Sequence, residues 1–161
     1  MQVSLIKCVY LRRYSLIKCD REVEYSLIKC DLKIWIMERL AINELLKWKN
    51  KQYRKPLIIE GARQVGKTWL VKEFARQNYR QLAYVNFEEM KILQNLFEQD
   101  FNIPRILTAI GAATNVTCTE GETLIFLDEI QAAPHAVTSL KYFAENALGY
   151  HVIAAGSLLG I

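Results

Sequence analysis

The sequence has few of the residues that disulfide-bonded, metal-binding or membrane-spanning proteins depend on. Its 161 residues include four cysteines and two histidines, and no apolar run approaches the length of a membrane span. Cys8, Cys19 and Cys30 follow one another at intervals of eleven residues, which fits neither zinc ligands nor a C-x-x-C redox motif. The two histidines lack the i, i+4 spacing of a metal pair, and the amino terminus lacks a continuous apolar signal core. These absences predict a cytoplasmic protein with reduced thiols and no membrane segment.

A strong charge excess is also missing. The formal net charge is +4, and residues 1–36 carry seven Lys and Arg against four Asp and Glu. Residues 37–161 carry fourteen against thirteen, so the larger part of the chain has no global nucleic-acid signature. A local basic run extends from Lys47 to Lys55. We interpret it as a solvated connector, because charge runs usually mark exposed faces, with a nucleic-acid contact as the alternative.

The first thirty-six residues carry a near-verbatim repeat. Ser-Leu-Ile-Lys-Cys occurs at Ser4–Cys8, Ser15–Cys19 and Ser26–Cys30. A period of eleven can wind a helix into a right-handed supercoil, and the same residues also suit short strands. Three such units are too small to bury a core of their own. We therefore interpret residues 1–36 as a leader outside the fold, generated by an in-frame DNA repeat upstream of a start at Met37, with a genuine interaction tail as the alternative.

A phosphate-binding motif lies between an apolar run and a helical pattern. Gly61–Thr68 reads Gly-Ala-Arg-Gln-Val-Gly-Lys-Thr, which is the G-x-x-x-x-G-K-[ST] pattern. It follows the strand-like run Pro56–Glu60 and precedes a segment whose apolar residues recur at helical spacing. The predicted context is therefore strand, glycine loop and helix.

The chemistry of this motif assigns a task to each residue type. Gly61 and Gly66 can adopt backbone angles closed to other residues and leave space for a phosphate. The amides at the start of the helix point at the anion, with the positive end of the helix dipole behind them. Lys67 is expected to face the β- and γ-phosphates, and the Thr68 hydroxyl to bind Mg²⁺. The candidate nucleotide-binding residues are Gly61, Ala62, Arg63, Gln64, Val65, Gly66, Lys67, Thr68 and Trp69.

A second motif supplies two acids. Leu124–Leu127 is an apolar run that suits a strand covered on both faces, and Asp128 and Glu129 follow it directly. Ligands bind at the carboxyl ends of strands in open α/β sheets. We therefore predict that Asp128 holds Mg²⁺ and that Glu129 polarises an attacking water.

Strand and helix patterns alternate along the chain. The predicted strands are residues 56–60, 81–87, 124–127 and 151–155, and the predicted helices are 37–48, 69–77, 88–99, 103–113 and 134–148. This alternation predicts an α/β fold, a three-layer α/β/α arrangement around a mostly parallel sheet with right-handed crossovers. The polar segment 115–122 reads as a loop, and we expect its Cys118 to be a free, exposed thiol.

These motifs, together with Ala-Ala-Gly-Ser-Leu-Leu-Gly at Ala154–Gly160, carry a family resemblance. The chain resembles prokaryotic AAA-type P-loop ATPases of the group in which this domain precedes a carboxyl-terminal domain of unknown function. The resemblance covers Met37–Ile161 and implies that ATP is the nucleotide, with Mg²⁺ as its metal. It implies that Lys67 and Thr68 belong to the Walker A motif, whereas Arg63 and Gln64 fit the loop without an assigned role.

The resemblance extends to the second motif and to one further position. It implies that Asp128 and Glu129 are the Walker B pair. It also implies that Ser157 is the first sensor, a polar contact to the γ-phosphate or the attacking water. A helix or turn cap is the alternative for this serine.

The family pattern continues where this chain stops. Beyond Ile161 the family has a fifth core strand, a helical lid and the carboxyl-terminal domain, so the resemblance predicts that residues 37–161 form an incomplete ATPase domain. In the family's strand order, 5-1-4-3-2, Pro56–Glu60 would then lie at an open, aggregation-prone edge.

Three functions follow from these observations. The first is Mg-ATP binding with hydrolysis by a water that Glu129 orients, and the longer protein can form a homo-oligomer. The second is a truncated remnant that binds nucleotide without hydrolysing it. The third is a nucleic-acid-binding module that uses Lys47–Lys55, which the overall charge disfavours.

Overall fold

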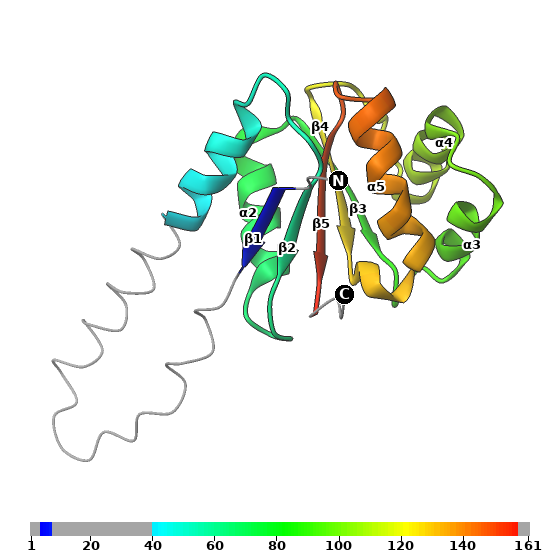
Figure 1. The fold of residues 1–161 in the computed structure, drawn as a ribbon, viewed down its shortest axis with the longest axis horizontal. Coiled ribbons are helices and arrows are strands. Elements are labelled where there is room, and N and C mark those ends of the chain that lie inside the picture. Colours follow the sequence, from blue (N-terminus) through cyan, green and yellow to red (C-terminus); the bar gives the residue numbers. More distant parts are fainter. Residues whose placement is uncertain (1–3, 8–39, 158–161) are drawn as a thin grey trace, which may run out of the picture.

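Strands and helices alternate along the chain, and the strands form one parallel sheet in the order β1-β2-β5-β4-β3 (Figure 1). This is a computed structural model that describes residues 4–7 and 40–157. The strands are β1 (Ser4–Lys7), β2 (Leu57–Glu60), β3 (Gln81–Asn86), β4 (Thr123–Asp128) and β5 (His151–Gly156). The helices are α2 (Lys67–Asn78), α3 (Ile92–Gln99), α4 (Ile103–Thr114) and α5 (Pro134–Asn146), with a further helix over residues 40–49 and a 3₁₀ turn, η1 (Ile130–Ala132).

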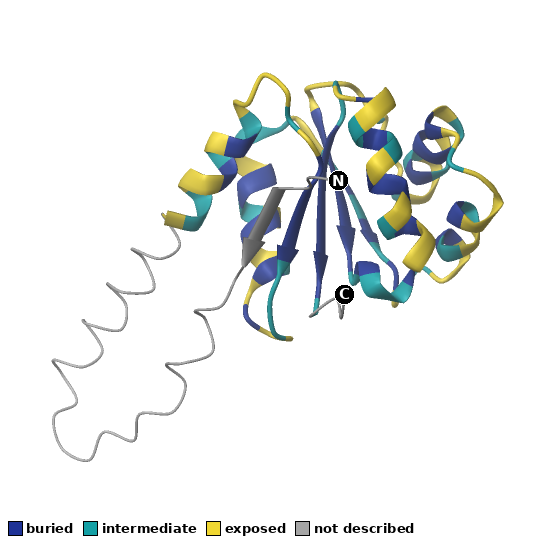
Figure 2. Cartoon of the chain, viewed as in Figure 1, coloured by how far each residue is buried: buried dark blue, intermediate teal, exposed yellow. Residues whose placement is uncertain are grey.

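The apolar strand residues divide between two cores because successive side chains of a strand point to opposite faces. In β4, Leu124 and Phe126 pack into one core, whereas Ile125 and Leu127 pack into the other. Helix α2 and the helix over residues 40–49 cover the first face, and α3, α4 and α5 cover the second (Figure 1). The inner strands are therefore buried on both sides (Figure 2), and the predicted α/β class with helices on both faces of a parallel sheet is confirmed.

The element bounds agree closely with the predicted ranges, with two differences. Residues 88–91 form a turn, so α3 begins at Ile92 rather than at Glu88. In the helix over residues 40–49, Leu45 and Trp48 are buried, whereas Leu40 is 59% exposed and lies outside the core. The stripe that this helix buries is therefore shorter than its apolar pattern suggested.

The edge of β2 does not stand open as predicted. β1 pairs with it in parallel over four residues, in the register Ser4↔Leu57 to Lys7↔Glu60. This pairing brings residues 4–7 into the sheet, although we had interpreted residues 1–36 as a leader outside the fold. The second and third repeat copies, Met37 and the end of the chain at residues 158–161 lie outside the described residues, so the division into leader and domain stays a prediction.

Candidate functional site

The two predicted motifs meet at one edge of the sheet. All the strand pairs are parallel, so β2, β4 and β5 end on the same side, where Figure 1 shows their arrowheads. The glycine loop leaves β2 at that edge and leads into α2, and the acidic pair stands at the end of β4. This is the edge at which ligands bind in open α/β sheets.

The loop backbone uses positive φ angles at two positions. Gly66 has φ 85° and immediately precedes α2, and Gln64 has φ 62°. Gly61 does not have a positive φ, so the unusual backbone angle expected of both glycines occurs only at Gly66. No side chain caps the amino terminus of α2, which leaves its first amides for an anion.

Lys67 is the first residue of α2 and is only 6% exposed. Its Nζ donates hydrogen bonds to the backbone oxygens of Gly61, at 2.9 Å, and Ala62, at 2.8 Å. A buried ammonium needs such partners, because removing a charge from water is costly. The phosphate loop therefore holds the Lys67 ammonium against the backbone of its first two residues, Gly61 and Ala62.

Asp128 is buried and accepts hydrogen bonds from three directions. Thr68 Oγ1 donates to its Oδ2 at 2.7 Å, and Tyr84 Oη donates to the same oxygen at 3.2 Å. The backbone N–H of Glu129 donates to Oδ1 at 3.0 Å. The structure thus brings together Thr68 and Asp128, which are sixty residues apart in the chain.

Tyr84 is a site residue that the sequence analysis missed. It lies on β3, whose register pairs Asn86 with Asp128, and burial together with the Asp128 carboxylate raises its pKa to about 12. Lys72 Nζ lies 3.7 Å from the centre of its ring. The pattern of residues 81–87 predicted the strand. Only the pairing register of β3 with β4 shows that the Tyr84 hydroxyl reaches Asp128 at the end of β4.

Glu129 adopts a left-handed backbone conformation, with φ 51° and ψ 44°. Such a conformation is uncommon for a glutamate, and strained backbone of this kind often occurs at functional sites. The side-chain amide of Gln131 donates a hydrogen bond to Glu129 Oε2. The sequence pattern assigned no role or contact to Gln131, which lies two residues beyond Glu129.

The remaining predicted residues lie around this centre without joining it. Arg63 donates to Glu88 Oε1 at 2.9 Å in an exposed ion pair, and Trp69 is 54% exposed. Ser157 follows β5 directly, next to Gly156, which pairs with Glu60 of β2. Its predicted contact with phosphate or water stays a prediction.

Two members of the basic run before β2 have structural partners. Lys49 Nζ donates to the backbone oxygen of Asn78 at 2.5 Å and lies over the ring of Tyr79. Arg54 Nη1 donates to the backbone oxygen of Lys49 at 2.7 Å and lies over the ring of Trp48. The run is therefore only partly the solvated connector that we predicted, because these two cations fasten the connector to the fold.

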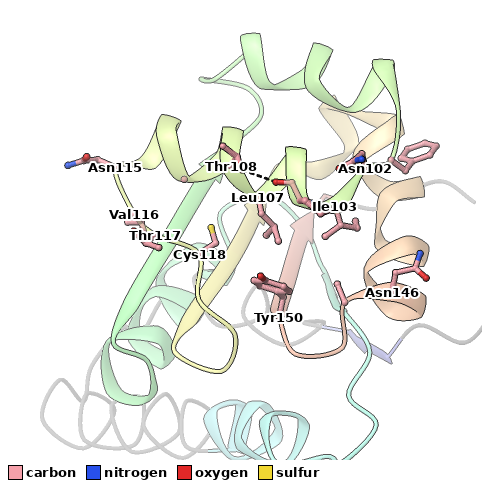
Figure 3. Close-up of a pocket in the computed structure, with 14 residues that line it drawn as sticks. Asn102, Ile103, Leu107, Thr108, Asn115, Val116, Thr117, Cys118, Asn146 and Tyr150 are labelled. Atoms are coloured by element: carbon pink, nitrogen blue, oxygen red, sulfur yellow. Dashed lines mark hydrogen bonds between the residues drawn. The ribbon is translucent and has the colours of Figure 1, made fainter.

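A cavity of about 860 Å³ lies away from the phosphate loop, near the amino ends of β4 and β5 (Figure 3). Its walls include Ile103 and Leu107 of α4, with Tyr150 and Asn146 on the opposite side, and it has no charged lining residue. A pocket without cations does not suit a nucleotide phosphate. Cys118 lines this cavity as a free but half-buried thiol, not an exposed one as predicted, and burial raises its pKa.

Within residues 4–7 and 40–157, no three His, Cys, Asp or Glu side chains come together as a metal cluster. None of the helices in the described part of the chain has the length and apolarity needed to cross a membrane.

Comparison with known proteins gives one match. A family model described as an AAA domain matches residues 53–161, which include β2 to β5 and both motifs. The comparisons with curated proteins and with solved structures found no match. The matched range covers more than half of the chain and contains the whole site described above.

Proposed function

The chain belongs to the family of AAA domains, which are nucleotide-binding domains of the ATPase type, and from this premise we propose that it binds Mg-ATP and hydrolyses it. The phosphates would lie in the loop Gly61–Thr68, and the water that attacks the γ-phosphate would lie beside Glu129. A cytoplasmic location and a homo-oligomeric assembly remain predictions.

One contact carries the proposal, the 2.7 Å hydrogen bond from Thr68 Oγ1 to Asp128 Oδ2. Thr68 stands at the end of a phosphate-binding sequence, and Asp128 at the end of a buried strand from another part of the chain. Any buried carboxylate needs hydrogen-bond donors, but this donor is the last residue of a phosphate-binding motif. Their approach supports a shared task at the phosphate end of the nucleotide.

The loop supplies the groups that bind phosphate. The uncapped amides at the start of α2 and the Lys67 ammonium are hydrogen-bond donors, and the helix dipole adds positive potential. In the structure, Lys67 Nζ donates to the oxygens of Gly61 and Ala62. When ATP binds, we expect its β- and γ-phosphate oxygens to take over these hydrogen bonds.

The Thr68 hydroxyl and the Asp128 carboxylate also fit Mg²⁺, which prefers oxygen ligands and takes few of them from the protein when phosphates supply the rest. Thr68 and Asp128 would hold the ion, and when bound it neutralises charge on the phosphate oxygens. Tyr84 would keep the Asp128 carboxylate in place through its hydrogen bond to Oδ2.

Glu129 is the candidate for orienting the attacking water. In the proposed step, the water oxygen forms a bond to the γ-phosphorus while the bond from that phosphorus to the bridging oxygen breaks, leaving ADP and phosphate. The Glu129 carboxylate accepts a hydrogen bond from the water and can receive its proton as the new bond forms. Ser157, just beyond β5, would supply a polar contact to the γ-phosphate or to this water.

The test measures Mg-ATP binding and phosphate release with the full chain. We expect Lys67→Ala to weaken binding and abolish release, and Glu129→Gln to keep binding and lower release by about 100-fold or more. Lys51→Ala and Glu98→Gln make the same chemical changes at exposed positions and should leave both quantities unchanged. If the wild-type chain binds Mg-ATP but releases no phosphate, the hydrolysis half of the proposal is wrong and the chain is a nucleotide-binding module. If Lys67→Ala binds Mg-ATP as tightly as wild type, the proposed phosphate site is wrong.

A further inference from the structure

The side chain of Gln131 lies between the acidic residue at the end of β4 and the last residue of β5. Its Nε2 donates a hydrogen bond to Glu129 Oε2, and its Oε1 lies beside Gly156. Both neighbours belong to the edge of the sheet at which the phosphate loop lies. The orientation of the amide follows from the carboxylate, because a flipped amide would place oxygen against oxygen.

This hydrogen bond is the only one that fixes the amide among the described residues. Gln131 Oε1 is buried and has no donor within that part of the chain. The left-handed backbone of Glu129 and the 3₁₀ turn that follows it bring residue 131 back toward the carboxylate. The Gln131 side chain is therefore held by Glu129 and in turn limits where the Glu129 carboxylate can lie.

Gly156 provides the space for this arrangement. A Cβ built at position 156 would lie 2.7 Å from Gln131 Oε1 and 3.4 Å from a side-chain methyl of Ile130. A contact of 2.7 Å is too short to persist, so one of the two groups would have to move. Since the atom in the way is the far end of a flexible side chain, an alanine at position 156 would displace Gln131 rather than the strand.

We propose that Gln131 is a positioning residue, which holds the Glu129 carboxylate where it can orient the attacking water, and that Gly156 is glycine to leave room for it. The inference rests on the proposed ATPase function and extends it by naming the residue that fixes the position of the Glu129 carboxylate. Gln131 acts through Glu129 and is not assigned a contact with substrate. Losing its amide should therefore affect turnover and not nucleotide binding.

The kinetic test uses Gln131→Leu, which keeps the size of the side chain but removes its donor. We expect the Kd for Mg-ATP to stay at the wild-type value and kcat for phosphate release to fall by about tenfold or more, because a displaced base loses much of its contribution. Gly156→Ala should lower kcat in the same direction. The double variant should be no slower than Gln131→Leu, since both changes act through one side chain.

The matched control is Gln77→Leu. Gln77 Nε2 also donates to a glutamate, Glu73 Oε1, at 2.6 Å, but on the exposed face of α2. This control should leave both binding and release unchanged. Wild-type kcat in Gln131→Leu would overturn the inference, and so would a double variant in which the two losses multiply.

A second measurement tests the contact without ATP. In the nuclear magnetic resonance spectrum of the ¹⁵N-labelled full chain, the side-chain amide of Gln131 should lie away from the free glutamine position and exchange slowly with solvent. Glu129→Ala should move it to the free position, while the amide of Gln94, which donates to the backbone oxygen of Phe87, stays unchanged. A Gln131 amide that does not respond to Glu129→Ala overturns the inference. If the contact responds but wild type releases no phosphate, hydrolysis has failed while the Gln131–Glu129 pairing stands.

Discussion

His151 should make the fold sensitive to mild acid. It is the first residue of β5, is only 6% exposed, and its Nδ1 lies 2.6 Å from the hydroxyl of Tyr79. Burial, followed by the positive charges of Arg54 and Lys49, lowers its pKa to about 4. The unfolded chain has no such surroundings and binds a proton near the ordinary pKa of about 6.5. The stability that neutral His151 contributes is therefore complete above pH 6.5 and is lost as the pH falls from 6.5 toward 4.

The size of this loss follows from the two pKa values. At pH 5 the unfolded chain is almost fully protonated at this position, whereas the folded chain is protonated in only about one molecule in ten, which corresponds to about 2 kcal/mol. For a domain of this size, that loss lowers Tm by about 4–8 °C. Lowered pKa values at Glu73, to about 2, and at Asp100 also remove stability in acid, but only at lower pH. The interval from pH 6.5 to pH 5 therefore reports on His151.

The assay is urea and thermal unfolding of the full chain at pH 8, 6.5 and 5. His151→Gln keeps a polar side chain but does not titrate, so its unfolding free energy should be lower at pH 8 and should change little down to pH 5. His135→Gln, at the exposed histidine on α5, should retain the wild-type loss. Equal losses of stability in wild type and His151→Gln between pH 6.5 and pH 5 would refute this role of His151.

Two further predictions concern the phosphate site. Tyr84→Phe removes a hydrogen-bond donor to Asp128 Oδ2 and should raise the Mg²⁺ concentration for half-maximal ATP binding by about tenfold, as loss of a partner of a metal ligand typically does. Tyr53→Phe, at a residue that is 76% exposed, is the control. An unchanged Mg²⁺ titration in Tyr84→Phe would contradict the role of Tyr84 in holding Asp128. Gly66→Ala forces a side chain into a backbone with φ 85° and should cost about 1–2 kcal/mol in urea unfolding while weakening nucleotide binding; unchanged stability would mean that the loop relaxes freely.

The elements and the two motifs could be predicted because each depends on residues close together in the chain. The P-loop pattern is eight residues long, and an apolar run followed by two acids predicts the buried strand β4. The meeting of Thr68 and Asp128 also followed, because parallel strands place their carboxyl ends on one edge. These predictions required only that the strands be parallel, and they did not depend on which residues pair between neighbouring strands.

The contacts that could not be predicted depend on register and on side-chain reach. Tyr84 meets Asp128 because β3 and β4 pair with Asn86 opposite Asp128, and no pattern within either strand determines that offset. Gln131 meets Glu129 because Glu129 takes a left-handed conformation, which sequence propensity does not favour for glutamate. Cys118 is half-buried because it packs against the core on the face that α3, α4 and α5 cover, although the polar composition of its segment indicated an exposed loop.

The outer edge of β2 shows why an edge strand is the hardest element to infer. Ladder hydrogen bonds join backbone groups, so a four-residue partner such as β1 needs no distinctive side-chain pattern to pair. The chain contains Ser-Leu-Ile-Lys three times, and periodicity treats the three copies alike. The apolar strand β2 offers an unpaired edge as a template, and any of its backbone groups that is buried without a hydrogen bond costs free energy. The pairing of a fifth strand therefore depends on the edge of the assembled sheet, and no local feature of residues 4–7 predicts it.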